Sequence, residues 1–176
     1  MTDRIGAVAD AASGLSDAAP AALVALHETG RPGRSIAELR QLVGLTHSGA
    51  VRLVDRLEAE GYVVRRPGGD ARTVAVVLTR RGTAAANRIR AARQEAVSAG
   101  LEGLDDRQRR QLEALAGVVL ATLAAQRRAL RASGQMPPGG ALCRLCDFMA
   151  CGRPQGRCPV AGTAGLADGS GGRMGG

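Results

Sequence analysis

Residues 35–61 read SIAELRQLVGLTHSGAVRLVDRLEAEG and contain the pattern of two short helices separated by a glycine. Ser35 and Glu38 stand three residues apart in a capping-box pattern, which predicts the start of a helix that ends at Gly44. Thr46 then caps a second helix, so only Leu45 lies between the helix stop and the next cap. Two helices joined by so short a turn predict a helix-turn-helix.

A β-hairpin is predicted directly after the second helix, which has Gly61 as its C-terminal stop. Residues 62–66 and 74–78 are rich in valine and predict two strands. Residues 67–73 between them form a glycine-rich turn region with a basic, polar tip. A helix-turn-helix followed by a hairpin is a winged helix, so the sequence predicts a mainly α fold with a small β-hairpin.

Flanking helices are predicted on both sides of the winged helix by caps and breakers. They cover residues 2–13, 19–28, 80–99 and 105–131. The last helix carries an apolar stripe, which we interpret as core or as a dimer seam. This stripe consists of Leu112, Leu115, Val119 and Leu123.

Composition narrows the class of protein. The chain has 176 residues, of which 45% are hydrophobic but only 1% are aromatic. Tyr62 and Phe148 are the whole aromatic set, so a base-stacking surface for single-stranded nucleic acid is excluded. No apolar run is long enough for a membrane span or a signal peptide, so we expect a cytoplasmic protein. No constellation typical of an enzyme stands out, so we expect no catalytic residues.

The charge of the chain is concentrated in the winged helix. All 24 basic residues are arginine, and against 16 acidic residues they give a net charge of +8. Residues 31–90 hold twelve arginines and five acids, whereas residues 1–30 are net negative. Charge localised in this way indicates an anionic partner, and the winged helix favours double-stranded DNA.

The second helix of a helix-turn-helix enters the major groove with its N-terminal residues at the base edges. In this sequence those residues are Thr46, His47 and Ser48, with Arg52 one turn further on. Arg56 is better placed for a phosphate. The hairpin tip offers Arg72 to the minor groove.

The same residues carry a family resemblance. Four short motifs, LVDRLEAEG at 53–61, VRR at 64–66, DAR at 70–72 and LTRRG at 78–82, stand in the order and spacing of the MarR family of bacterial transcription regulators. The chain resembles that family over about residues 15–130. The resemblance implies that Arg72 reaches into the minor groove and that Asp70 helps to hold it. It also implies a homodimer formed by the terminal helices.

With this resemblance, the sequence predicts three segments. Residues 1–132 form the winged-helix domain, with a DNA-binding core at about 31–82 and dimerisation helices at about 2–13 and 80–131. Residues 133–160 form a four-cysteine metal-binding segment, and residues 161–176 a disordered tail.

The four cysteines are the second concentrated signal. Cys143, Cys146, Cys151 and Cys158 fall within 16 residues, with glycines and arginines among them. In the cytoplasm such a cluster indicates metal ligands or redox groups. Three chemistries stay open: an iron–sulfur cluster, a zinc ion, or a metal-free thiol switch. The compact run ending in Cys-Pro is similar to the cysteine loop of the iron–sulfur redox sensor of the MerR family, which favours the cluster.

We interpret the chain as a sequence-specific transcription regulator, and we expect a repressor. Our hypothesis is that the redox or metal state of the four-cysteine centre gates operator binding. Whether a small-molecule effector binds is open. The alternative is a winged-helix protein-interaction module with a zinc-stapled C-terminal segment.

Overall fold

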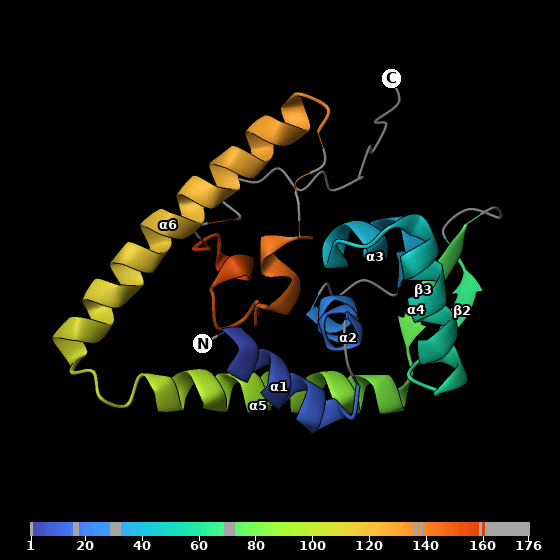
Figure 1. The fold of residues 1–176 in the computed structure, drawn as a ribbon, viewed down its shortest axis with the longest axis horizontal. Helices are drawn as coiled ribbons and strands as arrows, with labels where there is room; N and C mark the ends of the chain where they lie inside the picture. The colour runs from blue at the N-terminus through green and yellow to red at the C-terminus, as the bar shows by residue number, and fades with distance from the viewer. Residues whose placement is uncertain are drawn as a thin grey trace, which may run out of the picture. The chain divides into compact units, whose positions relative to one another are not determined.

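The computed structural model describes residues 2–15, 18–28, 33–68, 73–135, 137, 139–158 and 160 (Figure 1). Its elements in chain order are α1 (Thr2–Ser13), α2 (Ala19–Glu28), β1 (Arg34–Ser35), α3 (Ile36–Val43), α4 (His47–Ala59), β2 (Val63–Pro67), β3 (Val74–Leu78), α5 (Arg80–Gly100), α6 (Asp106–Ala132), and the 3₁₀ helices η1 (Leu142–Leu145) and η2 (Arg153–Gln155). The chain divides into two compact units. One comprises residues 1–109 and 138–147, and the other residues 110–137 and 148–176.

The predicted helix caps are confirmed. The Ser35 hydroxyl accepts the Glu38 N–H at 3.2 Å, and the Glu38 carboxylate accepts the Ser35 N–H at 2.9 Å, so the capping box at the start of α3 is complete. Gly44 ends α3 in the left-handed conformation, at φ 79°. A similar reciprocal pair joins Asp105 and Gln108 before α6.

The sheet has three strands in the order β1-β3-β2, all antiparallel, so the sequence prediction of a two-stranded hairpin was incomplete. β1 pairs Arg34 with Val76 and Ser35 with Ala75. The prediction that the first wing strand begins at Tyr62 was also wrong by one residue. The Tyr62 N–H is donated to the Leu57 carbonyl at 2.8 Å, where it closes the end of α4.

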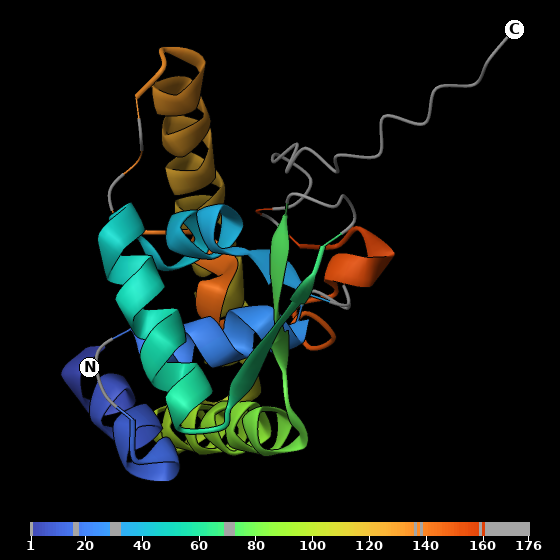
Figure 2. The same ribbon diagram turned by 90° about the vertical axis from the view of Figure 1, so that its right-hand side faces the viewer.

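The core of the first unit is aliphatic, as the composition predicts, and α2 lies at its centre. In Figure 2, α2 lies between α5 and the helix-turn-helix, and α4 lies beside the sheet. The largest fully buried side chains come from six elements: Leu23 and Val24 of α2, Leu39 of α3, Val54 and Leu57 of α4, Val63 of β2, Val76 of β3 and Ile89 of α5. α1 packs along α5 (Figure 1). The winged helix therefore rests on a helical base.

The junction between the wing and α5 is closely packed. Thr79 caps α5 by accepting the Gly82 N–H at 3.1 Å, and its hydroxyl donates to the Gly61 carbonyl at 2.7 Å. A Cβ on Gly82 would lie 2.0 Å from the Tyr62 carbonyl oxygen, so only glycine fits there. This contact explains why a glycine follows the Leu-Thr pair of the LTRRG motif.

The second unit contains most of α6 and the second half of the cysteine segment. The apolar stripe of α6 is exposed over its whole length: Leu112, Leu115, Val119 and Leu123 are 43%, 67%, 57% and 39% exposed. Gly152 and Gly156 are both left-handed and bracket η2, and the Arg153 guanidinium stacks over the Phe148 ring at 4.6 Å. Among the described residues, no helix is long and apolar enough to cross a membrane.

Candidate nucleic-acid interface

The first turn of α4 is capped and open to solvent. The Thr46 hydroxyl accepts the Gly49 N–H at 3.1 Å and lies 3.3 Å from the Ser48 hydroxyl. Thr46, His47 and Ser48 are all exposed. The structure thus brings together, on one exposed helix start, the three residues that the sequence predicts at the base edges.

Two arginines continue this exposed surface along α4. Arg52 and Arg56 are exposed and lie one turn apart. The opposite face of the helix is buried against the core through Ala50, Leu53, Val54 and Leu57. Because the buried face fixes the rotation of α4, both arginines are held on the side away from the protein.

The wing is joined to α4 by Arg65 of β2. Its backbone N–H donates to the Glu58 carboxylate at 2.9 Å, and its guanidinium forms ion pairs with Glu58 and, at 2.5 Å, with Asp55. The hydrogen bond to Asp55 raises the pKa of Arg65 above its ordinary value, and Glu58 adds to this effect against the opposing effect of burial. Sequence reasoning placed Arg65 in a strand but missed this link. Its signal was two acids at i and i+3 on α4, followed by an arginine in the next element.

The hairpin of the wing is regular over its described part. β2 and β3 pair from Val63 with Leu78 to Pro67 with Val74, and the Gly68 N–H donates to the Thr73 carbonyl at 2.7 Å. Asp70 and Arg72, predicted at the wing tip, lie outside the described residues. The described strands therefore end where the predicted minor-groove contact would begin.

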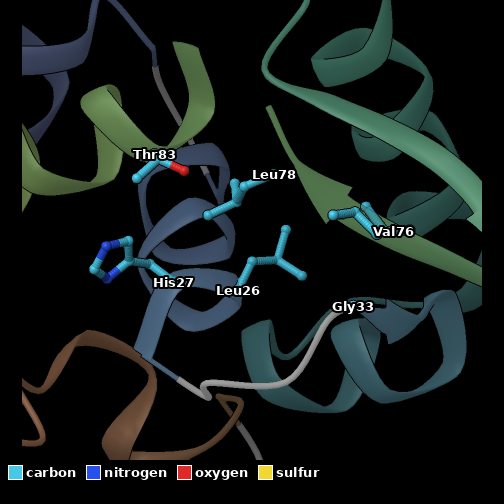
Figure 3. A pocket seen from close by; sticks show the side chains of 7 residues that line it. Leu26, His27, Gly33, Val76, Leu78 and Thr83 are labelled. Carbon is cyan, nitrogen blue, oxygen red and sulfur yellow. The ribbon is translucent and has the colours of Figure 1, made fainter. Parts of the chain in front are cut away.

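A small cavity of about 170 Å³ opens between α2, β3 and the start of α5 (Figure 3). His27 and Thr83 contribute polar side chains to its walls, and it is lined by Leu26, His27, Gly33, Val76, Val77, Leu78 and Thr83. His27 is half-buried and its Nδ1 lies 3.4 Å from the Glu28 carboxylate.

The first two cysteines belong to the first unit. Cys143 and Cys146 are half-buried at η1, and the Cys146 N–H donates to the Cys143 carbonyl at 3.1 Å. Arg93 of α5 interacts with this region: burial lowers the pKa of Arg93, the charge of Cys146 opposes that shift, and Arg144 adds to it. The structure therefore sets cationic side chains near a cysteine whose sulfur carries negative charge when ionised.

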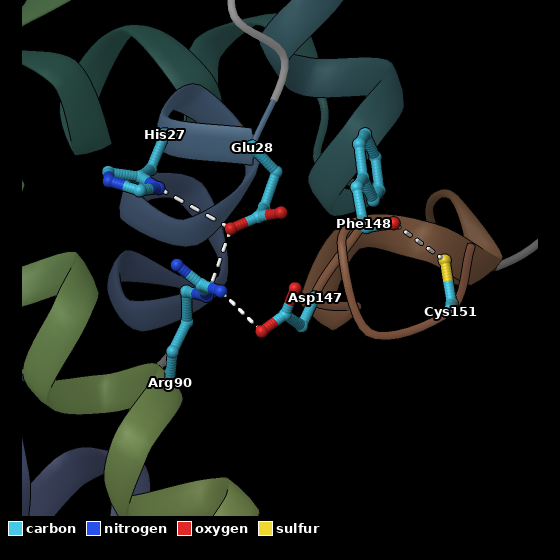
Figure 4. Close-up of polar contacts among 6 residues, drawn as sticks. All are labelled: His27, Glu28, Arg90, Asp147, Phe148 and Cys151. Carbon is cyan, nitrogen blue, oxygen red and sulfur yellow. Dashed lines mark hydrogen bonds and ion pairs between the residues drawn. The ribbon is translucent and has the colours of Figure 1, made fainter. Parts of the chain in front are cut away.

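The last two cysteines belong to the second unit. Cys151 is half-buried with its Sγ 3.5 Å from the Phe148 carbonyl oxygen (Figure 4), and Cys158 is buried. Over the part of the chain that the structure describes, no three side chains of His, Cys, Asp or Glu stand together in a group that could hold a metal ion. The four-cysteine metal site stays a prediction from the sequence.

Comparisons with known proteins found a family model that matches part of the chain and solved structures of similar fold. Residues 13–73 match the MarR family model. Three solved structures share the fold. A MarR family protein from Bacillus stearothermophilus has a TM-score of 0.61 at 23% identity, covering 69% of this chain and 84% of that one. Apo MarR from E. coli has a TM-score of 0.57 at 22% identity, and the match covers 68% of this chain and 90% of that one. A MarR family transcriptional regulator from Rhodococcus sp. RHA1 has a TM-score of 0.53 at 24% identity, and the match covers 67% of this chain and 85% of that one.

No curated protein sequence matches the chain. The structural likeness nevertheless shows that the fold is the winged helix of MarR family regulators, as the sequence resemblance predicts. The match to the family model spans the helix-turn-helix and reaches into the wing, which are the parts that carry the candidate interface.

Proposed function

We propose that this protein is a MarR family transcription regulator, a repressor, that binds double-stranded DNA as a homodimer. The observation that carries the proposal is the exposed, capped start of α4, held to a wing by Arg65. The match of residues 13–73 to the family and the excess of arginine in residues 31–90 support it.

In this proposal, α4 enters the major groove. Thr46, His47 and Ser48 meet base edges, and Arg52 reads a guanine through paired hydrogen bonds. Arg56, one turn further, contacts a phosphate. Arg72 at the wing tip enters the minor groove with Asp70 beside it.

The homodimer is supported by α6. Its exposed apolar residues Leu112, Leu115, Val119 and Leu123 recur on one helical face, and a monomer would leave this face in water. A second copy of α6 is its proposed cover. A two-fold dimer would set two copies of α4 about one DNA turn apart, or about 34 Å.

The four cysteines are proposed to hold an iron–sulfur cluster or a zinc ion, or to switch as thiols. Four cysteine sulfurs are a complete donor set for either metal centre. Arg93 interacts with the charge of Cys146, and such positive charge would offset the charge of bound thiolates. We further propose that the state of these cysteines controls the affinity for DNA.

Duplex binding tests the regulator directly. The full chain is titrated into labelled genomic duplex at several salt concentrations, with unrelated duplex as competitor. A DNA reader loses affinity steeply with salt and still prefers certain sequences. Binding to duplex that is absent, or that shows no sequence preference, would favour a winged-helix protein-interaction module instead.

The absorption spectrum and metal content of protein purified without oxygen test the centre. Iron, sulfide and a visible band identify a cluster, and about one zinc per chain identifies a zinc site. Protein with no metal whose DNA affinity is the same under oxidising and reducing conditions would contradict both the metal centre and the thiol switch.

A further inference from the structure

The first half of the cysteine segment, residues 139–147, packs on the helix-turn-helix, and we call this contact the seat. The Ala141 N–H donates to the Leu42 carbonyl at 2.8 Å, in the last turn of α3. The last carbonyls of a helix lack partners within the helix, so this bond caps α3 from a segment about a hundred residues away in sequence.

Two glycines make this seat possible. A Cβ on Gly44 would lie 2.4 Å from the Gly140 nitrogen, and a Cβ on Gly140 would lie 2.5 Å from the Leu42 carbonyl oxygen. Gly44 is the turn residue between α3 and the N-cap of α4. The backbone of the segment therefore touches the turn that positions the recognition helix.

The other end of the segment is held by charge. Asp147 forms an ion pair with Arg90 of α5, whose Nε lies 2.9 Å from the Glu28 carboxylate of α2 (Figure 4). The Glu28 side chain is only 6% exposed, so this ion pair is largely shielded from water. Between the two ends, η1 packs against α2.

Cys143 and Cys146 lie between these two attachments. The Arg144 N–H donates to the Ala141 carbonyl at 3.2 Å, and the Cys146 N–H donates to that of Cys143 at 3.1 Å. A change at either sulfur that alters η1 therefore acts on Ala141, which is bonded to α3.

We propose that residues 139–147 are a built-in ligand of the helix-turn-helix, and that chemistry at Cys143 and Cys146 changes DNA affinity by loosening this seat. The inference rests on the proposed DNA binding and names the route of its regulation. It assigns the effect to the first two cysteines and to the contact with α3.

A pair of glycine variants tests the seat. Gly139 and Gly140 have φ of 75° and 71°, so alanine strains the backbone similarly at both. Only Gly140→Ala adds a clash with α3, because nothing lies within 4 Å of a Cβ on Gly139. We expect the Ala141 amide to exchange its hydrogen about ten-fold faster in Gly140→Ala than in Gly139→Ala.

The chemical arm uses iodoacetamide on the reduced full chain. Alkylation adds bulk to half-buried sulfurs, and we expect it to weaken duplex binding about five-fold or more in the wild type and in Gly139→Ala. In Gly140→Ala the contact with α3 is already disrupted, so alkylation should weaken duplex binding less than about two-fold. The Cys143→Ser/Cys146→Ser double variant should not respond.

Two outcomes of the alkylation experiment would contradict the inference. An equal response in both glycine variants, or a response that persists in the double serine variant, overturns the inference. If no variant binds duplex, the proposed function has failed. The seat is then tested by hydrogen exchange alone: alkylation should speed exchange of the Ala141 and Leu45 amides, and unchanged exchange would contradict the inference. Asp147→Asn, which opens the other end without adding atoms, replaces Gly140→Ala if the latter does not fold.

Discussion

Arg65 of β2 donates its backbone N–H to the carboxylate of Glu58 on α4 at 2.9 Å, and its guanidinium contacts the same carboxylate. One acidic side chain thus holds a strand of the wing to the recognition helix through both its backbone and its side chain. The two elements proposed to contact DNA are thereby fixed relative to each other, before any DNA is present.

Loss of this link should weaken DNA binding although it removes a negative charge. Glu58→Ala makes the surface more positive, which alone would strengthen binding to DNA. We expect instead a loss of about three-fold or more, because the wing is no longer held. Anisotropy with a preferred duplex measures it. Glu60→Ala removes an exposed acid at the end of the same helix and should bind as well as the wild type or better.

Arg52 should carry sequence preference. A paired contact between arginine and guanine discriminates against a wrong base by about 1–3 kcal/mol. Arg52→Ala should therefore lose about 5- to 150-fold in affinity for the preferred duplex, and little for random duplex. Arg107→Ala removes an exposed arginine near the start of α6 and serves as the control. Equal losses of affinity in the two variants would mean that Arg52 contributes only its positive charge and no sequence preference.

Arg72 should act through the minor groove. Arg72→Ala should cut duplex affinity sharply, with the largest effect on sites whose flanks are rich in A·T pairs, where the minor groove is narrow. The comparison is between duplexes that differ only in these flanks. Unchanged affinity on both would mean that the wing does not contact DNA.

The apolar face of α6 should form the dimer. Leu115 is 67% exposed, and a two-fold interface would bury it in both copies. Leu115→Arg places a charge in this interface and should cost about 2–3 kcal/mol of the free energy of dimerisation. The dimer dissociation constant should therefore rise about 100-fold. Sedimentation measures it. Glu113→Gln changes the charge by the same amount at a position outside the apolar stripe, and a similar effect there would contradict the assignment.

Gly82 should be irreplaceable for stability. Gly82→Ala forces its Cβ to within 2.0 Å of the Tyr62 carbonyl oxygen, and relieving that overlap costs about 1–3 kcal/mol or more. Tm should fall by at least about 2 °C. Gly6→Ala, in α1 with nothing near its Cβ, should raise stability by about 0.5–1 kcal/mol. Similar Tm values for both variants would rule out the clash.

The helices were predictable from sequence because their caps are local. Ser35 with Glu38, Thr46 and Thr79 each bond a backbone group three residues away, so their chemistry can be read within one short window. β1 was missed because two residues carry no alternation, and it exists only by pairing with β3.

The candidate interface was predictable only in part. The exposed start of α4 follows from the helix-turn-helix pattern, whereas the link from Arg65 to Asp55 and Glu58 depends on how the wing folds back. The contact of Ala141 with Leu42 joins residues far apart in the chain, and no local pattern marks it. The chemistry of the four cysteines stays a prediction.

Selection of binding sites from a random duplex library by the full chain decides whether this winged helix reads a DNA sequence. We expect enrichment of an inverted repeat whose half-sites lie about one helical turn, or about 10 base pairs, apart, with the preference lost in Arg52→Ala. A library that emerges without any enriched sequence, while the protein is folded and dimeric, would contradict sequence-specific binding by this winged helix.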